Sequence, residues 1–355
     1  MKKLNHVVAA SLAALSVWGL SGCASLGGGC ACEATTNTCA CGAACACTDC
    51  TCQGPVGRWA LDREGAYWLG IEKAADGTLS AKLLWRGGSP NPQQDVKVEG
   101  LVATMKQTLK GDKNPAKARV RITTLTAAGT KANLTFQTVD GTGKILGTET
   151  ATATRIPALP PAPDRAQAVF GAPVDLLSSL DGWKSMNPTA HFGWSMKDGV
   201  LSNRIKRKPD GSRDGHGANL VTKRADFFDF KISYDVRVLP NCNSGVYLRG
   251  IYEIQVLDSY GKPVDCHNMA AFYGRITPSV AAEKPANEWQ HVDVMLYKRH
   301  VTVTLNGVTI IDNQPVLGCT GGAITSNEFV PGPIYLQGDH SDADFRNMVL
   351  TPIVK

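Results

Sequence analysis

Residues 244–261 decide the fold, and they read SGVYLRGIYEIQVLDSYG. Successive side chains of a β-strand point to opposite faces. Tyr252, Ile254 and Val256 should therefore share one face, while Glu253 and Gln255 share the other. The β-branched and aromatic residues around them favour a strand. The stretch predicts a strand with one apolar face for a core and one polar stripe, an arrangement that suits a carbohydrate site.

The rest of the C-terminal half repeats this strand-like pattern. Strands are expected near residues 230–238, 245–248, 252–257, 291–297, 301–305, 334–337 and 345–352. Asn306-Gly307 lies between two β-branched runs, which is the strongest short signal for a hairpin. Many short strands with Gly and Pro turns predict an all-β sandwich or jelly roll.

A proline-rich segment divides the chain. Residues 156–163 read IPALPPAP and should run as an extended linker, because proline has no backbone N–H to donate. Upstream, short alternating segments separated by Asp-Gly turns predict a small antiparallel β domain. We therefore expect a β domain at 55–156, a linker at 157–168 and the sandwich at 169–355.

The start of the chain has the layout of an export signal. Lys2 and Lys3 precede an apolar run over residues 7–20, which is too short to span a bilayer as a mature helix. Residues 20–23, LSGC, resemble the bacterial lipobox, whose cysteine is lipidated. This predicts a lipoprotein signal peptide at 1–22 and a lipid-anchored Cys23, with an ordinary signal cleaved near Gly22 as the alternative. With Ala24 next, we expect an exported cell-envelope lipoprotein, on the outer membrane or its periplasmic face.

Residues 23–54 form a cysteine-rich tether between this anchor and the domains. Its Cys-x-Cys pairs are Cys30 and Cys32, Cys39 and Cys41, Cys45 and Cys47, and Cys50 and Cys52. An exported segment meets oxidising conditions, so disulfides are one interpretation. Paired thiolates that capture zinc or copper are a second interpretation, and a spacer with neither is the third.

Several motifs together resemble one known family, the 3-keto-disaccharide hydrolases, also described as 3-keto-glucoside lyases or hydratases. They occur in the family's order within residues 170–353, and they are NSGVYLR at 243–249, YEIQVLD at 252–258, FYG at 272–274, EWQ at 288–290, LNG at 305–307, and GPIYLQGDH at 332–340. The resemblance implies a concanavalin A-like jelly roll. It also implies an enzyme that cleaves 3-keto-glucosides or 3-keto-disaccharides, by hydrolysis or by elimination and hydration.

That chemistry needs a base, a stabiliser of the enolate oxygen and a proton donor. The ketone at C3 acidifies the C2 hydrogen, so the paired carboxylates of ordinary glycosidases are not required. Glu253 is the candidate base, or else the structural ion-pair partner of Arg249. Tyr273 and Arg249 are candidates to stabilise negative charge. His340 is a candidate acid or base, or else a solvated loop residue.

The same motifs supply candidate sugar contacts and a candidate metal group. Gln255, Asp258, Tyr247, Gln337 and Asp339, together with Arg249, are expected to bind substrate. Tyr247, Trp194 and Trp289 could stack on sugar rings, although Trp289, just before a strand, has a core interpretation as its alternative. Asp258, Asp339 and His340 could instead hold Ca²⁺, Mn²⁺ or Zn²⁺. His216 and His267 have mainly a structural interpretation.

Three cysteines remain in the sandwich segment, Cys242, Cys266 and Cys319. In an exported domain two of them should pair, and Cys242 with Cys266 is the expected disulfide. A catalytic thiol is an alternative with little support, because no histidine stands in a recognised nucleophile context.

The charge pattern gives no sign of nucleic-acid binding. Lys and Arg number 37 against 31 Asp and Glu, and the excess is spread along the chain. The expected partners are therefore an oligosaccharide or glycoside substrate, a membrane reached through the lipid anchor, and a sugar 3-dehydrogenase coupled through its keto product. The alternative function is a non-catalytic, lectin-like envelope lipoprotein, since the same sandwich can bind sugars without chemistry.

Overall fold

A computed structural model describes residues 54–109 and 118–355 of the chain. Within these ranges the regular elements are β-strands, apart from two short 3-10 helices, η3 (Arg165–Gln167) and η4 (Leu180–Gly182). The all-β prediction is therefore confirmed. Over the same residues, none of the helices has the length and apolar character needed to cross a membrane.

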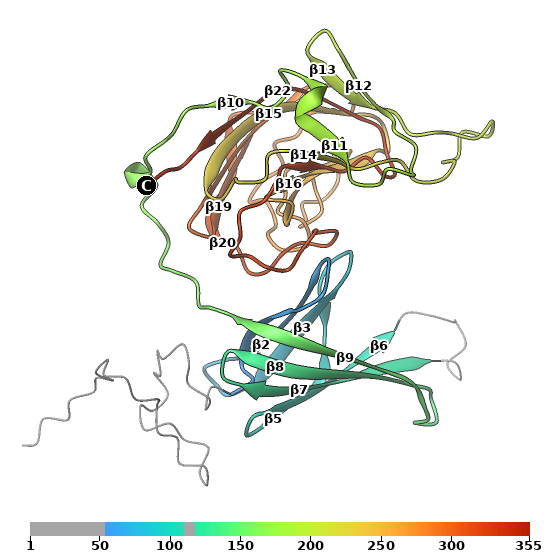
Figure 1. The fold of residues 1–355 in the computed structure, drawn as a ribbon, viewed down its shortest axis with the longest axis vertical. Helices are drawn as coiled ribbons and strands as arrows, with labels where there is room; N and C mark the ends of the chain where they lie inside the picture. Colours follow the sequence, from blue (N-terminus) through green and yellow to red (C-terminus); the bar gives the residue numbers. More distant parts are fainter. Residues whose placement is uncertain (1–53, 110–117) are drawn as a thin grey trace, which may run out of the picture.

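The N-terminal domain is a nine-stranded antiparallel sheet with the order β4-β3-β2-β1-β9-β8-β7-β6-β5. It curls around a core that includes Trp59, Leu69, Leu83, Leu125 and Phe136 (Figure 1). The strands are β1 (Gly57–Leu61), β2 (Tyr67–Lys73), β3 (Leu79–Trp85), β4 (Asn91–Pro92), β5 (Gln94–Glu99), β6 (Val102–Leu109), β7 (Arg119–Ala128), β8 (Lys131–Val139) and β9 (Ile145–Ile156).

The C-terminal domain contains two antiparallel sheets. The larger follows the order β12-β13-β22-β15-β18-β19-β20, with β10 paired to β22, and the smaller follows β11-β14-β21-β16-β17. Their strands are β10 (Val174–Asp175), β11 (Trp183–Ser185), β12 (Trp194–Lys197), β13 (Val200–Asn203), β14 (Leu220–Thr222), β15 (Phe230–Val238), β16 (Asn243–Leu248), β17 (Tyr252–Leu257), β18 (Gln290–Tyr297), β19 (His300–Leu305), β20 (Val308–Pro315), β21 (Tyr335–Leu336) and β22 (Ala343–Pro352).

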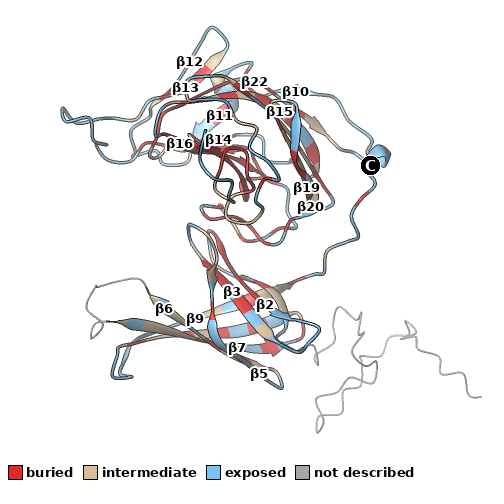
Figure 2. Cartoon of the chain, turned by 180° about the vertical axis from the view of Figure 1, so that it is seen from behind, coloured by how far each residue is buried: buried red, intermediate tan, exposed pale blue. Residues whose placement is uncertain are grey.

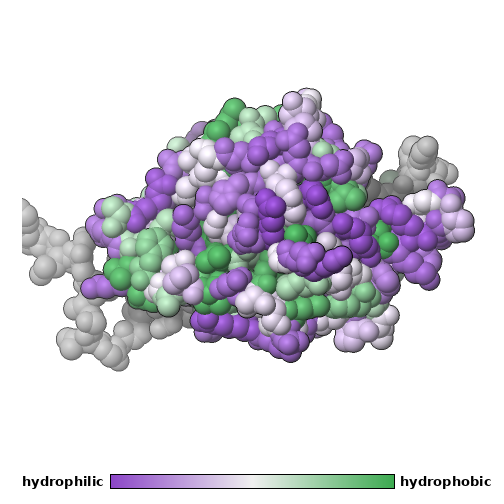
Figure 3. Space-filling model, turned by 90° about the horizontal axis from the view of Figure 1, so that it is seen from above, coloured by the Kyte–Doolittle hydropathy of each residue, from purple (hydrophilic) through white to green (hydrophobic). Residues whose placement is uncertain are grey.

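The two sheets pack face to face, as predicted, and bury one continuous apolar core (Figure 2). Tyr252, Ile254 and Val256 of β17 belong to this core, which also contains Phe230 and Phe345 of the larger sheet. The predicted alternation along β17 is thus confirmed. From above (Figure 3), the surface is mostly hydrophilic with small, separate apolar patches.

The two domains are joined by direct contacts as well as by the linker. The indole N–H of Trp68 on β2 donates to the carbonyl of Cys319 at 3.0 Å, and the backbone N–H of Tyr67 donates to Ser326 Oγ at 2.6 Å. The linker packs on the sandwich, where Arg299 donates to the carbonyl of Pro157 at 3.2 Å. Residues 318–326, which we call the 318–326 loop, therefore lie between the two domains.

A buried carboxylate, Glu328, sits beside this interface with 0% of its surface exposed. Arg58 Nη1 of the N-terminal domain lies 3.2 Å from Glu328 Oε2. Tyr252 Oη donates to Glu328 Oε1 at 2.8 Å, and the N–H of Gly318 donates to the same oxygen at 3.2 Å. Arg299 lies 3.9 Å from Oε2. We call this group the Glu328 cluster.

The cysteines of the sandwich are not paired. Cys242, Cys266 and Cys319 are all free, so the predicted Cys242–Cys266 disulfide is wrong. Cys242 is buried in the sandwich core, whereas Cys266 is partly exposed with its Sγ 3.7 Å from Nδ1 of the neighbouring His267. The predicted signal, the Cys23 anchor and the Cys-x-Cys tether lie outside the described residues.

Candidate active site

The candidate site occupies the outer face of the five-stranded sheet. Tyr335 on β21 stands opposite Tyr247 on β16, which in turn stands opposite Glu253 on β17. Strand alternation places Gln255 on the same face, next to Glu253. The backbone of Gln337 continues β21 and donates to β16 at 2.9 Å. Three neighbouring strands thus present one polar stripe, with Glu253 at its edge.

Glu253 is a buried carboxyl group with only 3% of its surface exposed. Burial raises its pKa to about 8, against the hydrogen bond from Tyr247, and the nearby charge of Asp339 adds to the increase. Gly245 on the paired strand makes room for it, because a Cβ there would lie 2.3 Å from Glu253 Oε1. The group is therefore a stronger base than an ordinary carboxylate once it has lost its proton.

The hydroxyl group of Tyr247 lies within hydrogen-bond distance of two acceptors, and one of them is Glu253. Its Oη lies 2.8 Å from Glu253 Oε2 and 2.8 Å from the carbonyl of Gly321. A phenol has one proton, so it can donate to only one of them at a time. When Glu253 is protonated, it can donate to Tyr247 while Tyr247 donates to Gly321. When Glu253 is ionised, Tyr247 donates to Glu253 and the Gly321 carbonyl loses this donor.

The 318–326 loop supports both residues from the side of the N-terminal domain. Thr320 Oγ1 accepts from the backbone N–H of Glu253 at 2.9 Å and contacts the carbonyl of Ile251 at 3.2 Å. A Cβ at Gly322 would lie 2.5 Å from Tyr247 Oη. The loop thereby fixes the backbone of Glu253 and the phenol that contacts its side chain.

Two amides next to Glu253 provide hydrogen-bonding groups. Gln255 is 2% exposed, and its Oε1 accepts from the N–H of Val256 at 3.1 Å. Gln337 Oε1 is buried and has no hydrogen-bond partner among the described residues. Buried polar atoms are rarely left without a partner. A hydroxyl group of a bound sugar is a suitable donor for Gln337.

Tyr273 lies beside Glu253, in a loop that follows β17. Its backbone N–H donates to the carbonyl of Glu253 at 3.0 Å, and its side chain is partly exposed. Burial raises the pKa of Tyr273, and the charge of Glu253 raises it further. The phenol therefore keeps its proton at neutral pH and is available as a donor.

Asp339 and His340 form a second polar pair at the site. His340 Nδ1 lies 2.5 Å from Asp339 Oδ1. Burial acts to raise the pKa of Asp339, but the hydrogen bond and charge of His340 outweigh it and lower the pKa overall. The negative charge of Asp339 in turn raises the pKa values of Glu253 and Tyr335. The exposed His216 also acts on the charge of Asp339, so it lies near the rim of this group.

The side chains of Arg249 and Asp258 have other partners in the structure, and their contact with substrate stays a prediction. Arg249 Nη2 donates to the carbonyls of Glu328 at 2.6 Å and Val330 at 2.7 Å. Its backbone turns there, with φ of 55° between β16 and β17, and its side chain is 2% exposed. Asp258 Oδ2 accepts from the N–H of Asn241 at 2.9 Å. Glu253 therefore has no ion pair with Arg249.

The three candidate stacking residues are also placed differently from the expectation. Tyr247 is 1% exposed and stacks on Tyr335 with a ring separation of 4.1 Å, so it contacts Glu253 rather than a sugar ring. Trp194 is a core residue whose indole donates to the carbonyl of Ala218 at 2.7 Å. Trp289 has an arginine against its ring, Arg346, at 4.1 Å.

The expected metal group does not assemble. Oδ2 of Asp258 accepts from the N–H of Asn241, and Asp339 lies against His340. Among the described residues, the group of three potential ligands within 4.8 Å of one another is Asp265, Cys266 and His267. These are consecutive residues of one loop, and this geometry alone does not define a metal site.

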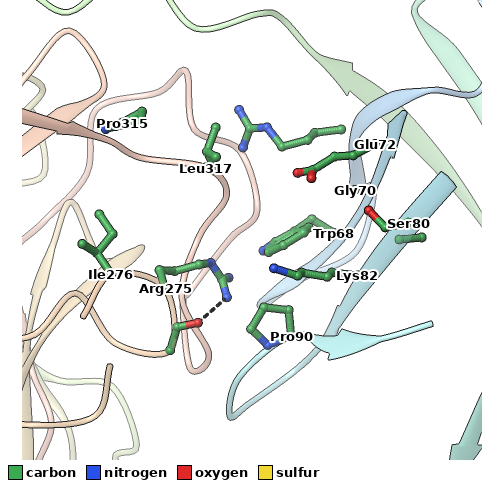
Figure 4. A pocket seen from close by; sticks show the side chains of 13 residues that line it. Trp68, Gly70, Glu72, Ser80, Lys82, Pro90, Arg275, Ile276, Pro315 and Leu317 are labelled. Atoms are coloured by element: carbon green, nitrogen blue, oxygen red, sulfur yellow. Dashed lines mark hydrogen bonds between the residues drawn. The ribbon is translucent and has the colours of Figure 1, made fainter. Parts of the chain in front are cut away.

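Two residues near this site were not predicted to take part in it. His267 had a mainly structural interpretation, and Ser89 carried no sequence signal. His267 packs edge-on against Tyr273 with ring centroids 5.2 Å apart, and Ser89 Oγ of the N-terminal domain lies 2.8 Å from its Nε2. A cavity of about 150 Å³ also lies between the domains, lined by Trp68, Lys82, Arg275 and Leu317 among others (Figure 4). Glu253 does not line it.

Comparison with known families agrees with this geometry. Residues 174–351 match the family described as the 3-keto-alpha-glucoside-1,2-lyase-like domain, which covers half of the chain and includes the whole polar stripe. The chain belongs to this family. As a 3-keto-glucoside lyase-like protein, it is a member of a carbohydrate-active group with a sandwich fold.

Among solved structures, three proteins of Parabacteroides distasonis ATCC 8503 are similar, each described as a "putative glycosyl hydrolase". Their sequence identities are 27%, 19% and 24%, with TM-scores of 0.39, 0.41 and 0.38. The matches cover 50%, 53% and 51% of this chain, and 82%, 95% and 98% of those proteins. At these TM-scores they carry no argument about mechanism. No curated protein matches the chain.

Proposed function

We propose that this 3-keto-glucoside lyase-like protein cleaves 3-keto-glucosides or 3-keto-disaccharides, with Glu253 as the base. One observation carries the proposal. Glu253 is a buried carboxyl group whose pKa is raised to about 8, on the polar face of a domain that belongs to this family. Strongly shifted acids on a polar face are typical of catalytic groups.

The reaction follows from the acidity of the substrate. The ketone at C3 acidifies the hydrogen at C2, so ionised Glu253 takes that proton and the electron pair forms an enolate. The C1–O bond then breaks, and the leaving oxygen takes a proton from a donor. Water adds to the resulting enone, which gives net hydrolysis, or the enone leaves the site as a lyase product. A base with a pKa near the working pH suits this proton transfer.

The other side chains of the stripe have complementary roles in this proposal. Tyr273 keeps its proton at neutral pH and serves as the donor to the leaving oxygen or the enolate. His340, paired with Asp339, is the second candidate acid. Gln255 and Gln337 orient sugar hydroxyls, and Gln337 Oε1 accepts from one of them. Tyr247 positions Glu253.

Deuterium exchange at C2 tests the base directly. In D₂O, the wild type should release product from a 3-keto-disaccharide and introduce deuterium at C2, as mass spectrometry will show. Glu253→Gln should do neither. Glu288→Gln, a change at an exposed glutamate, is the matched control and should behave as wild type. Exchange at the wild-type rate in Glu253→Gln would remove Glu253 from the role of base.

The same assay separates catalysis from binding alone. Each variant is incubated with the keto sugar, with the unoxidised disaccharide and with a chelator. Cleavage of the keto sugar alone supports the proposed enzyme, and loss of cleavage with the chelator would restore a role for Ca²⁺, Mn²⁺ or Zn²⁺. Binding without cleavage of either sugar would favour the lectin-like alternative.

The location of the protein is a separate proposal that rests on the sequence. A lipid on Cys23 would hold the enzyme at the cell envelope, where a sugar 3-dehydrogenase would supply the ketone. Mass spectrometry of the membrane-extracted protein tests the anchor. An unmodified cysteine, or a chain cleaved near Gly22 without lipid, would contradict it.

A further inference from the structure

The N-terminal domain contacts the candidate site through residues 86–90, which connect β3 and β4 and are called here the 86–90 loop. The carbonyl of Arg86 accepts from the N–H of Gly322 at 2.9 Å. Ser89 Oγ lies 2.8 Å from His267 Nε2. The first contact holds the loop that supports Tyr247 and Glu253, and the second holds a side chain that packs on Tyr273.

These contacts are close enough to require glycine. A Cβ at Gly321 would lie 2.4 Å from the carbonyl oxygen of Gly88, across the domain boundary. A Cβ at Gly274, next to Tyr273, would lie 2.7 Å from Ser89 Oγ. Both distances are shorter than real Cβ contacts allow, so the backbones of Gly321 and Gly88 meet directly and the Ser89 side chain lies directly against the backbone of Gly274. The carbonyl of Gly321 is the same group that accepts from Tyr247.

His267 links the two domains through its ring nitrogens. Its Nε2 lies 2.8 Å from Ser89 Oγ of the N-terminal domain. Its Nδ1 lies 3.3 Å from Asp265 Oδ1 and 3.7 Å from Cys266 Sγ, within its own loop. When Nδ1 carries the ring proton, Nε2 accepts from the Ser89 hydroxyl, and when Nε2 carries it, the hydroxyl accepts. In both tautomers the Ser89–His267 hydrogen bond crosses from one domain to the other.

We propose that the N-terminal domain completes the keto-sugar site, with Ser89 as a positioning residue that acts through His267 on Tyr273. Ser89 Oγ holds the imidazole through Nε2, the imidazole packs on the phenol of Tyr273 with ring centroids 5.2 Å apart, and the backbone N–H of Tyr273 donates to the carbonyl of Glu253 at 3.0 Å. The inference rests on the proposed function, because it assigns Ser89 to the same reaction.

Asp265, His267 and Ser89 are also the residue types of a nucleophilic triad. The backbone next to Ser89, however, does not suit a nucleophile. In many serine hydrolases the N–H of the residue after the nucleophile stabilises the oxyanion. Here that residue is Pro90, which has no N–H. Ser89 is therefore placed to orient His267.

The surrounding interface explains why a change at Ser89 should act locally. The contacts of Trp68, Tyr67 and the Glu328 cluster join the domains independently of Ser89. In Figure 4, Arg275 points between the domains next to Trp68, and Pro90 lies across the same cavity. Removal of one hydroxyl leaves all of these in place.

The test compares two variants of the full chain. Ser89→Ala removes the hydroxyl that hydrogen-bonds His267 Nε2, and Thr148→Ala removes an exposed hydroxyl elsewhere in the N-terminal domain. With a 3-keto-disaccharide, Ser89→Ala should lower kcat about tenfold, with KM changed less than about twofold, because misplaced catalytic groups cost rate rather than binding. Thr148→Ala should match the wild type.

Nitrogen NMR of the histidine rings supplies a readout that does not need activity. The Nε2 signal of His267 should move in Ser89→Ala, and it should move in the wild type when an unoxidised disaccharide is added. Wild-type values of kcat, KM and the His267 signal in Ser89→Ala would overturn the proposal.

The two proposals can fail separately. If the wild type does not cleave keto sugars, the proposed function fails and the titration alone decides the present inference. A bound disaccharide that leaves His267 unmoved, or no binding at all, then overturns it. A sugar-induced shift that Ser89→Ala abolishes supports a composite sugar site without that reaction.

Discussion

Two buried glutamates in the C-terminal domain show how burial leads to different outcomes. Glu328 is 0% exposed and meets Arg58, Tyr252 and the N–H of Gly318. Glu253 is 3% exposed, and within residues 54–109 and 118–355 its carboxyl group has one hydrogen-bond donor, Tyr247. A buried carboxylate with cationic partners is a structural element. One with a single neutral donor and a pKa raised to about 8 is prepared to exchange a proton.

The largest expected effect is on turnover. Glu253→Gln should reduce kcat by about 10³-fold, the size of a general-base contribution, and leave the fold intact. Mass spectrometry of the released product measures the loss of kcat. Circular dichroism of the variant shows whether the fold is intact. A loss of fold in Glu253→Gln would make Glu253 a structural residue like Glu328.

The same substitution at the other buried glutamate, Glu328→Gln, should lower the stability of the protein. Glu328→Gln leaves Arg58 and Arg299 without their buried counter-charge, and we expect a loss of about 3 kcal/mol in the free energy of unfolding. Urea denaturation measures this. Below the unfolding transition, the pH profile of kcat should stay that of the wild type. A shifted profile would show that Glu328 takes part in proton transfer.

The pH dependence of stability should also distinguish Glu253. Its pKa is raised from 4.5 to about 8, so the folded state keeps a proton that the unfolded chain has lost. Its contribution is fully present below about pH 4.5 and is lost as the pH rises through about 8. Glu253→Gln, which keeps an uncharged side chain, should therefore be more stable than wild type by about 4 kcal/mol at pH 8. Urea denaturation of both proteins measures this. A difference in unfolding free energy between Glu253→Gln and wild type that is the same at pH 5 and pH 8 would contradict the raised pKa.

The smallest expected effect is a shift of the pH profile when the hydroxyl group of Tyr247, the donor to Glu253, is removed. Tyr247→Phe removes the hydrogen bond that opposes the rise in the pKa of Glu253. The pH at which kcat/KM reaches half its maximum should then move upward, which lowers the rate at pH 7 by roughly three- to tenfold. A pH series of initial rates checks this, and a downward shift would exclude the proposed contact.

The sequence predicted the strands that carry the site, β16, β17 and β21, but not every side chain near them. Alternation along 252–257 correctly separated Glu253 and Gln255 from the core residues Ile254 and Val256. It could not place Arg249, because the chain leaves the strand there with φ of 55° and the side chain turns toward the carbonyls of Glu328 and Val330. Alternation holds only while the backbone stays extended.

Contacts between distant segments were beyond sequence reasoning. Ser89 and His267 are 178 residues apart, and neither lies in a recognised motif. The free cysteines show the same limit, because pairing requires two sulfurs to meet and the fold buries Cys242 away from the loop of Cys266. The strands β5 and β6 were also missed, although they complete one edge of the N-terminal sheet.

The contact between Gly88 and Gly321 has a consequence for the order of events during folding and unfolding. Each domain has most of its core to itself, although Ala66, Trp68 and Leu84 of the N-terminal domain pack into the sandwich core, and the backbone that carries the Tyr247 acceptor lies against Gly88 of the N-terminal domain. We expect this backbone to reach its position when the two domains dock. During folding, the protein should therefore become catalytically active only after both cores have formed and the domains have docked. On warming, activity should disappear when the domains part, before either core melts, so loss of turnover would report undocking rather than denaturation.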